Sequence, residues 1–212
     1  MKDKDGSVRM QVLGEIEKIQ KPSIIPVLKG ALSDKDKQVR IKAIGALGSI
    51  DHPDALVALA EAAKDKDLVI KLSVIDKMAV IGNDTVVPVL SESLGDPNLS
   101  VRLSVVTTLG AIGTEDAVGS IATAVEDGDV KVRLLAINIL KALKAKSAVP
   151  ALCDRLMKEG KPNLKIELIS ALGAIGSREA LGTLAEYLKK ADEKILQPEV
   201  IKAINQIVAT KK

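Results

Sequence analysis

VRLSVVTTLGAIG, residues 101–113, is the stretch that decides the fold. Its apolar residues from Val101 to Ile112 recur at i, i+4, i+8 and i+11, so they share one helical face. Asn98 lies three residues upstream, where its side-chain oxygen can cap free N–H groups. Gly113 can close the helix in the left-handed conformation. The stretch therefore predicts one α-helix of about fifteen residues with its own start and stop signals.

The Val-Arg pair that opens this helix returns along the whole chain. Its copies are Val8-Arg9, Val39-Arg40, Ile70-Lys71, Val132-Arg133, Leu164-Lys165 and the weaker Leu196-Gln197. The spacing is 31 residues up to Val132 and 32 residues beyond it. So constant a period is the signature of a solenoid, in which each unit contacts only its neighbours. We therefore expect residues 1–212 to form a single solenoid domain with one continuous core.

A shorter apolar segment lies between successive copies. These segments run roughly over residues 22–32, 53–63, 84–94, 115–125, 147–157 and 178–190. Pro26, Pro88 and Pro150 recur in them at one position, where a proline should bend or weaken the helix. Pro198 indicates that the last helix is either kinked or begins there. The prediction is an all-α, right-handed solenoid of about thirteen helices, with an N-terminal half repeat (1–20) and six helix pairs (21–212).

Composition limits the core and the partners. Hydrophobic residues make up 47% of the chain, Phe and Trp are absent, and Tyr187 is the only aromatic residue, so the core must be aliphatic. The net charge is +3, from 31 basic and 28 acidic residues. A net charge so close to zero does not indicate the excess of basic residues that is typical of nucleic-acid-binding proteins. Lys141, Lys144 and Lys146 are interpreted as a solvated face rather than a nucleic-acid site.

The chain carries no targeting signal that we can identify. Its start, MKDKDGSVRM, has no apolar segment of the kind that signal peptides contain. No run of about 18 apolar residues is present, so no membrane span is expected. Cys153 is the only cysteine, which excludes an internal disulfide and fits a reducing compartment. A cytoplasmic location is the expectation.

The repeat resembles the short HEAT repeats named after phycobiliprotein lyases. Their unit reads approximately D-x-D-x-x-V-R-x-x-A-x-x-A-L-G-x-I-G, followed by a second helix. Residues 34–50 match it almost fully, and residues 96–113 and 164–176 match well. The C-terminal unit departs from the pattern, because Ala191 and Gln197 replace its acid and its base. The resemblance covers essentially the whole chain, and it implies a fold more than a function, because the family serves many unrelated binding tasks.

Acidic and basic residues repeat with the fold. The pairs Asp34/Arg40, Asp65/Lys71, Asp96/Arg102, Asp127/Arg133 and Glu159/Lys165 share a six-residue offset. In similar repeats such charges form a ladder between neighbouring units. We therefore expect Arg102 to hold Asp96 in the ladder, and the ladder to loosen toward the C-terminus, where Lys replaces Arg. An electrostatic binding face for a ligand is the alternative.

Two glutamates distinguish the first long helix. Glu15 and Glu17 stand where later helices carry small residues such as Ala46 and Gly48. Terminal units of solenoids need a polar outer face. We therefore expect both glutamates to mark an N-terminal end with no repeat before it.

Candidates for chemistry are few. His52 is the only histidine, and we interpret it as a solvated turn residue, because a metal site needs three or four convergent ligands. HEAT-repeat di-iron hydroxylases carry several His-Glu pairs, which this chain lacks. Cys153 aligns with small or polar residues, so we expect a partly exposed thiol without an activating base. The sequence predicts no catalytic residue, no metal site and no cofactor, and hence a protein that is not an enzyme.

The resemblance also implies a binding surface. In this family the helices that begin with Val-Arg line the concave face, and the residue two positions after the Val looks inward. These residues are Met10, Ile41, Leu72, Leu103, Leu134 and Ile166, and Leu68 and Leu99 extend the row. Small residues such as Gly14, Gly45 and Ala111 lie four and eight positions further on. Such a surface suits an amphipathic helix or an apolar segment of another protein. Packing between neighbouring helices is the alternative for the same side chains.

Two functions follow as hypotheses. The leading one is a non-catalytic scaffold that binds a segment of another protein on the concave face. The alternative is a subunit of a phycobilin lyase or chaperone that acts on a tetrapyrrole-bearing protein, because the family takes its name from such lyases. The alternative predicts a shift in bilin absorbance on mixing, and the scaffold predicts none. The oligomeric state does not follow from the sequence.

Overall fold

The structure is a computed structural model that describes residues 4–189 and 195–210. Within these residues the chain forms thirteen α-helices and no strand, which confirms the all-α solenoid class. Long helices that begin at the Val-Arg signal alternate with shorter ones. The long helices are α1 (Gly6–Glu17), α3 (Lys37–Leu47), α5 (Leu68–Ile81), α7 (Leu99–Ile112), α9 (Val130–Ala142), α11 (Pro162–Ile175) and α13 (Gln197–Ala209).

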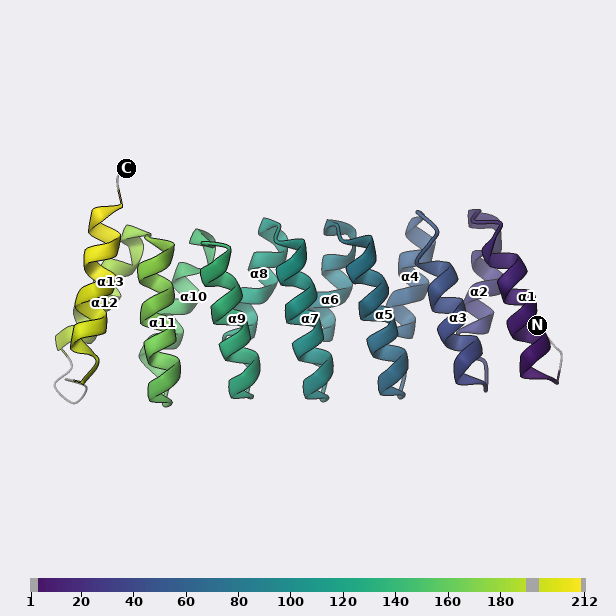
Figure 1. Cartoon of the computed structure of the whole chain (residues 1–212), viewed down its shortest axis with the longest axis horizontal. Coiled ribbons are helices and arrows are strands. Elements are labelled where there is room, and N and C mark those ends of the chain that lie inside the picture. The colour runs from purple at the N-terminus through teal and green to yellow at the C-terminus, as the bar shows by residue number, and fades with distance from the viewer. Residues whose placement is uncertain (1–3, 190–194, 211–212) are drawn as a thin grey trace. The chain divides into compact units, whose positions relative to one another are not determined.

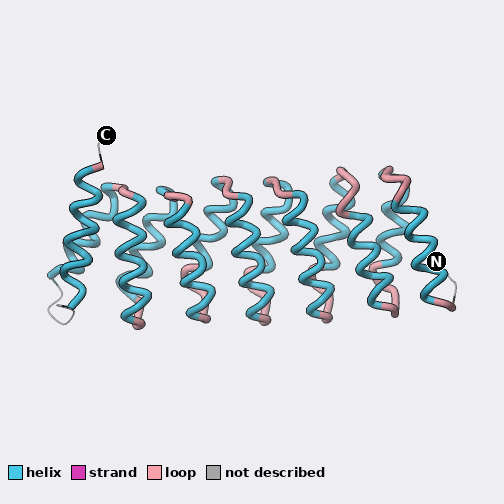
Figure 2. The backbone as a smooth tube through the Cα atoms, viewed as in Figure 1, coloured by secondary structure: helices cyan, strands magenta, loops and turns pink. Residues whose placement is uncertain are grey.

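The short helices fall where the apolar segments predict them. They are α2 (Ile25–Ala31), α4 (Pro53–Ala62), α6 (Val87–Ser93), α8 (Glu115–Ala124), α10 (Val149–Lys158) and α12 (Leu181–Lys189). Four of them follow a single turn of 3-10 helix, at Pro22–Ile24, Asp84–Val86, Lys146–Ala148 and Arg178–Ala180. Short loops join the successive helices (Figure 2).

Contacts divide the chain into two compact units, residues 1–108 and 109–212, with the boundary inside α7. In unit 1 the long helices α1, α3 and α5 form one layer, and α2, α4 and α6 form a second layer (Figure 1). Unit 2 has two layers of its own, one of α9, α11 and α13 and one of α8, α10 and α12 (Figure 1). The expectation of a single domain over residues 1–212 stays a prediction, as does the handedness.

The Asp-x-Asp sequence before the long helices builds a double cap. In α9, Asp129 accepts a hydrogen bond from the Lys131 N–H at 2.7 Å, and Asp127 accepts one from the Asp129 N–H, also at 2.7 Å. The second acid therefore satisfies a free N–H of the first helical turn, and the first acid fixes the turn that leads into it. The same pair of bonds recurs at Asp34 and Asp36.

The predicted helix ends are also present. Asn98 accepts a hydrogen bond from the Ser100 N–H at 2.9 Å, and Gly113 closes α7 with φ of +66°. A left-handed residue is cheap for glycine because it has no Cβ to clash with the backbone. Gly82 and Gly176 close α5 and α11 in the same conformation.

The prolines of the short helices sit at one structural position. Pro26, Pro88 and Pro150 each occupy the first turn of an α-helix, directly after the 3-10 turn. A first-turn residue needs no N–H partner, so proline is tolerated there, and each proline stands where the segment changes from 3-10 to α winding rather than in the interior of an α-helix. Pro198 lies in the first turn of α13, so this helix begins there rather than being kinked.

Aliphatic side chains fill the space between the two layers. Leu28, Leu47, Leu59 and Leu90 are fully buried in unit 1, and Ile121, Ile137 and Leu140 are fully buried in unit 2. Tyr187 is also buried, at 4% exposure. Each repeat can bury its apolar face only against its neighbours, and this is why the repeat determines the fold.

Candidate functional site

Charged side chains form a ladder at the turns that lead into the long helices. Arg9 on α1 holds Asp34 of the following repeat in a bidentate pair, with Nε–Oδ2 and Nη2–Oδ1 distances of 2.7 Å. Arg40 Nε lies 3.4 Å from Asp65 Oδ2. The Lys71 ammonium contacts the Asp96 carboxylate. Each base therefore reaches the acid that lies 25 residues ahead of it in these three pairs.

Arginines of the ladder also bind the acidic residue six positions before them, but through the backbone carbonyl of that residue and not through its carboxylate. Arg40 Nη1 donates to the Asp34 carbonyl at 2.8 Å, and Arg102 Nη1 donates to the Asp96 carbonyl at 2.9 Å. The prediction that Arg102 holds the Asp96 carboxylate is therefore wrong, because Lys71 of the preceding repeat occupies that carboxylate. A guanidinium group has donors on several edges, so one arginine can bind its own turn and the next one.

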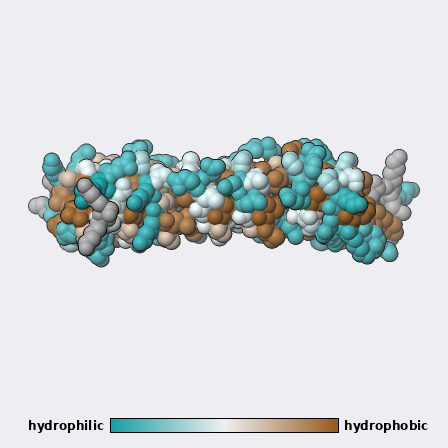
Figure 3. Space-filling view, turned by 90° about the horizontal axis from the view of Figure 1, so that it is seen from above, coloured by the Kyte–Doolittle hydropathy of each residue, from teal (hydrophilic) through white to brown (hydrophobic). Residues whose placement is uncertain are grey.

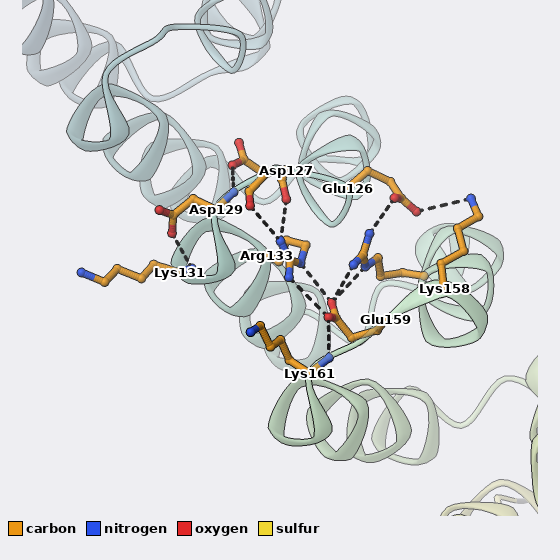
Figure 4. Close-up of polar contacts among 10 residues, drawn as sticks. Glu126, Asp127, Asp129, Lys131, Arg133, Lys158, Glu159 and Lys161 are labelled. Atoms are coloured by element: carbon orange, nitrogen blue, oxygen red, sulfur yellow. Dashed lines mark hydrogen bonds and ion pairs between the residues drawn. The ribbon is translucent and has the colours of Figure 1, made fainter. Parts of the chain in front are cut away.

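The most buried part of the ladder lies in unit 2 (Figure 4). Arg133 on α9 binds Glu159 with Nε–Oε2 and Nη2–Oε1 distances of 3.0 and 3.3 Å. Its Nη1 also donates to the Asp127 carbonyl at 2.8 Å. The side chains of Arg133 and Glu159 are 8% and 1% exposed. The expected loosening concerns rungs with Lys in place of Arg; this rung keeps its arginine, and Glu159 is the most buried acid of the ladder.

A second arginine completes this cluster. Arg155 on α10 donates to Glu159 Oε2 through Nη2 at 2.9 Å and to Glu126 Oε2 through Nη1 at 3.0 Å (Figure 4). The Lys161 N–H also donates to Glu159, at 2.9 Å. Burial by itself would raise the pKa of Glu159, but the Lys161 N–H and the two guanidinium groups outweigh it and lower this pKa to about 2.

The ladder charges are thus satisfied inside the protein. In unit 1, hydrogen bonds from the Arg9 guanidinium lower the pKa of Asp34 below its ordinary value. Groups that already have short, partly buried partners offer little to an external ligand. Of the two interpretations of the repeated acids and bases, these contacts favour the ladder over an electrostatic binding face.

The predicted apolar row lies on the side of the long helices that faces solvent. Met10, Ile41, Leu72, Leu103 and Leu134 are half-buried, and Ile166 is 37% exposed. We call these six residues the aliphatic stripe. Leu68, at 36% exposure, and the half-buried Leu99 flank it in unit 1. The side chains are neither core nor fully free, so part of each one remains open to a partner.

Exposure rises along each long helix beyond the stripe. The positions eight residues after the stripe are all exposed, namely Lys18, Ser49, Val80, Ala111, Ala142 and Ala174. Val80 reaches 76% exposure. Figure 3 looks onto the ends of the helices and shows hydrophilic and hydrophobic residues side by side there. The exposed positions beyond the stripe hold small residues at Ser49, Ala111, Ala142 and Ala174.

The small-residue positions are not all open. A Cβ atom built on Gly48 would lie 3.1 Å from Cδ of Lys77, and one on Gly45 would lie 3.9 Å from its Cε. The aliphatic stem of Lys77, on α5, therefore runs over α3. In unit 2, Ile139 approaches Gly110 in the same way, at 2.8 Å from the Cβ that glycine lacks. Some of these glycines thus allow neighbouring long helices to approach closely.

The two glutamates of α1 have different environments. Glu15 is exposed and pairs with Lys18 at 2.8 Å, as expected for a polar outer face. Glu17 is half-buried and contacts Lys42 on α3. It therefore faces the following repeat, and its interpretation as part of a polar end is wrong. Gly48, at the equivalent position after α3, likewise lies against a lysine of the next long helix, Lys77 of α5.

The other candidate residues have structural roles. His52 caps α4, since its Nδ1 accepts the Asp54 N–H at 3.1 Å. Cys153 is only 7% exposed, so the expected partial exposure is wrong, and burial raises the pKa of its thiol. Lys141 donates to Ser170 at 2.8 Å, so it is not a free surface lysine. Across residues 4–189 and 195–210, no three metal-ligating side chains gather into a possible metal site.

The repeat architecture and its ladder can now be compared with known proteins. Residues 1–76, 61–127 and 119–205 match the model of the family described as HEAT repeats. The chain belongs to the HEAT-repeat family. No curated protein matches it. None of the helices in the described part of this HEAT-repeat chain is long and apolar enough to cross a membrane.

Solved structures with the same architecture include enzymes and proteins of other kinds. The alignment with the Escherichia coli protein YibA has 24% identity and a TM-score of 0.56, and it covers 99% of this chain and 78% of the YibA chain. The alignment with human deoxyhypusine hydroxylase has 23% identity and a TM-score of 0.52, and it covers 98% of this chain and 81% of the hydroxylase chain. At these identities the likeness shows the fold alone.

A phycobiliprotein-lyase likeness is also present. The complex of CpcE and CpcF of phycocyanin lyase from Nostoc is 20% identical over 98% of this chain and 90% of that chain, with a TM-score of 0.48. A likeness at this score does not extend to activity.

Proposed function

We propose that this HEAT-repeat protein is a non-catalytic scaffold that binds a segment of another protein on the stripe-bearing face of its long helices. The observation that supports the proposal is the aliphatic stripe, which the folded chain leaves partly open on successive helices. Singly exposed apolar side chains are ordinary, but within each unit a row at one position of consecutive repeats forms an apolar track. The ladder acids and bases are paired with one another, so they do not compete with the track as a binding surface.

The geometry of the repeat indicates how a partner would match the stripe. Packed helices stand about 8–10 Å apart, so successive stripe residues are separated by roughly this distance. Residues i and i+7 of an α-helix are about 10.5 Å apart along its axis, and residues i and i+3 of an extended polyproline II segment lie on one face about 9 Å apart. A helix would therefore present one apolar residue per heptad, and an extended segment one in every third position.

Unit 1 is the stronger half of this surface. It contains Met10, Ile41, Leu72 and Leu103 of the stripe, together with Leu68 and Leu99. Val69, beside Leu68, is also 45% exposed. Two neighbouring apolar side chains are therefore exposed beside the stripe at the start of α5, and we assign the centre of the binding surface to this region.

The test is to substitute the stripe and then measure stability and binding separately. Leu103→Asp, Leu68→Asp and the matched control Val57→Asp would be purified as full chains. Val57 is 56% exposed on α4, in the layer of short helices. We expect all three to melt within a few degrees of the parent. A partner captured from the native lysate should be retained by the control, and both stripe variants should lose it, because each would bury an unpaired carboxylate in the complex.

Two outcomes would contradict this function. A collapse in melting temperature for Leu103→Asp and Leu68→Asp together would show that the stripe is part of the core. Equal capture by all three variants would show that the partner binds elsewhere. The lyase or chaperone role stays a prediction, to be tested by the bilin absorbance of a mixture.

A further inference from the structure

The first helix differs from the later long helices in its neighbours. In the later repeats, long helices such as α3, α5, α9, α11 and α13 contact the short helix that precedes them: α2, α4, α8, α10 and α12 respectively. Within residues 4–189 and 195–210, no short helix precedes α1. The face of α1 that such a helix would cover can be identified from the equivalent residues of the other repeats.

Two positions of the long helix form the seam with the short helix. The first is the Val of the Val-Arg pair, and its exposure is at most 5% in the six later repeats, at Val39, Ile70, Val101, Val132, Leu164 and Leu196. The second lies four residues later, with at most 1% exposure at Ala43, Val74, Val105, Ala136, Leu168 and Val200. In α1 the same two positions are Val8 and Val12, at 40% and 41% exposure.

The two ends of the chain show which neighbour covers these positions. Among the described helices, α13 has a short helix before it and none after it, and its Leu196 and Val200 are 5% and 1% exposed. Helix α1 has the opposite arrangement, and its two positions are open. The preceding short helix therefore buries the seam. The following repeat buries a different position, since Leu13 of α1 is 0% exposed and its equivalent in α13, Ile201, is 49% exposed.

Two further residues widen the apolar surface at this end. Ile16 of α1 is half-buried, as is Ile204 at the same position of α13, whereas the equivalents Leu47, Met78, Leu109, Leu140 and Leu172 are at most 1% exposed. Val27 of α2 is 42% exposed, whereas its equivalents are buried at Ala58 and half-buried at Val89, Ser120, Ala151 and Thr183. We call Val8, Val12, Ile16 and Val27 the open seam.

We propose that the open seam binds a short amphipathic helix of a partner protein, which takes the place that short helices hold in the later repeats. This docking site is separate from the aliphatic stripe and does not rest on the function proposed for it. The expected helix has about ten residues, because α4 and α10 each have 10 residues. Its apolar residues should recur at i, i+3, i+4 and i+7, as Ala55, Ala58, Leu59 and Ala62 do in α4.

The polar residues of α1 favour a single helix over the end of a second copy. The position that faces a preceding long helix holds Lys77 in α5, Ile139 in α9 and Ala203 in α13, each of which approaches a glycine on the preceding long helix. In α1 this position is Glu15, which is exposed and paired with Lys18. The end of the chain therefore offers an apolar seat for a short helix beside a polar surface where a long helix would have to pack.

The probe for this site is a helix of the protein itself. A fluorescent peptide of residues 52–64 contains α4 and its capping residue His52. We expect it to bind the full chain saturably in an anisotropy titration. Val12→Glu in the protein, or Leu59→Glu in the peptide, should each weaken binding at least about tenfold, because each places a carboxylate in an apolar contact. Val57→Glu in the protein, on the exposed side of α4, is the matched control and should leave the affinity unchanged.

A second measurement allows for the weak helicity of a short peptide. Residues 52–62 are joined to the N-terminus of the full chain, where residues 1–5 provide a linker as long as residues 63–67 between α4 and α5. The joined chain should melt at a higher temperature than the parent, and Val12→Glu should remove the gain. Val12 is already exposed, so this variant should not lower the melting temperature of the parent chain.

Three results would overturn the proposal. The first is an unchanged melting temperature of the joined chain. The second is a free peptide that does not bind up to about 1 mM, or that binds Val12→Glu as well as the parent. The third is a dimer of the unmodified chain, seen by light scattering, that Val12→Glu converts to a monomer, because the occupant of the seam would then be a second copy.

Discussion

Glu159 should make a large, pH-dependent contribution to stability, and Glu159→Gln tests it. The carboxylate is 1% exposed and is bound by Arg133, Arg155 and the Lys161 N–H. Its pKa falls from an ordinary value of 4.5 to about 2. One pH unit corresponds to about 1.4 kcal/mol, so the ionised group stabilises the fold by about 3 kcal/mol at neutral pH.

The direction of the pH dependence follows from this lowered pKa. The unfolded chain takes up a proton near pH 4.5, and the folded chain takes it up only near pH 2. The contribution of Glu159 is therefore complete above about pH 5 and is lost as the pH falls through 4.5 toward 2. Glutamine keeps the shape of the side chain but has no charge to lose. The difference between the parent and Glu159→Gln should consequently shrink across this range.

The assay is urea denaturation of both proteins at pH 7, 4.5 and 3. The control is Glu126→Gln, because Glu126 binds the same Arg155 but is 44% exposed, and such a surface pair contributes less than about 1 kcal/mol. We expect the Glu159 variant to lose about 3 kcal/mol at pH 7 and the control to lose much less. Equal losses for the two variants, or a parent–variant difference that does not change with pH, would refute the assignment of the lowered pKa to this buried cluster.

Two more predictions concern packing and capping. Gly173→Ala should destabilise the protein by roughly 1–3 kcal/mol, because its new Cβ would lie 2.9 Å from the Cα of Ala203. The new Cβ of Gly182→Ala meets no atom within 4 Å, so this control should be neutral or stabilising. A calorimetric melt of both variants checks the contrast. Asp129→Ala should cost about 1 kcal/mol in urea denaturation, because the N–H of Lys131 would lose its cap, and an unchanged midpoint would argue against that role.

The positions of the aliphatic stripe can be predicted from the sequence, but their exposure cannot. The period places Met10, Ile41 and Leu72 at one position of successive helices, and the structure puts this position at the solvent side. The sequence left open whether such residues are exposed or packed, because exposure depends on the neighbouring helices. The structure gives an intermediate answer, with half-buried side chains that a partner could still cover.

The open seam was not among the sequence predictions, although its signal was present. Val8 and Val12 carry the same residue types as their buried equivalents, so composition at these positions gives no warning of exposure. The informative signal is the order of elements, since the first long helix has no short helix before it in the described residues. Glu15 lies on a different side of α1, and the sequence prediction of a polar end concerned that side only.

The sequence by itself determined the helices, their ends and their order. The 31-residue period, the Asp and Asn caps and the glycine at φ of +66° after Ile112 act through neighbours in the chain, so they can be recognised without a fold. Only the tertiary structure decided which charges pair and which apolar residues are covered. Arg9 meets Asp34 across a repeat boundary, Lys71 rather than Arg102 holds the Asp96 carboxylate, and Cys153 is buried. Such contacts depend on how neighbouring repeats stack, and stacking brings together side chains that lie some 25 residues apart in the chain.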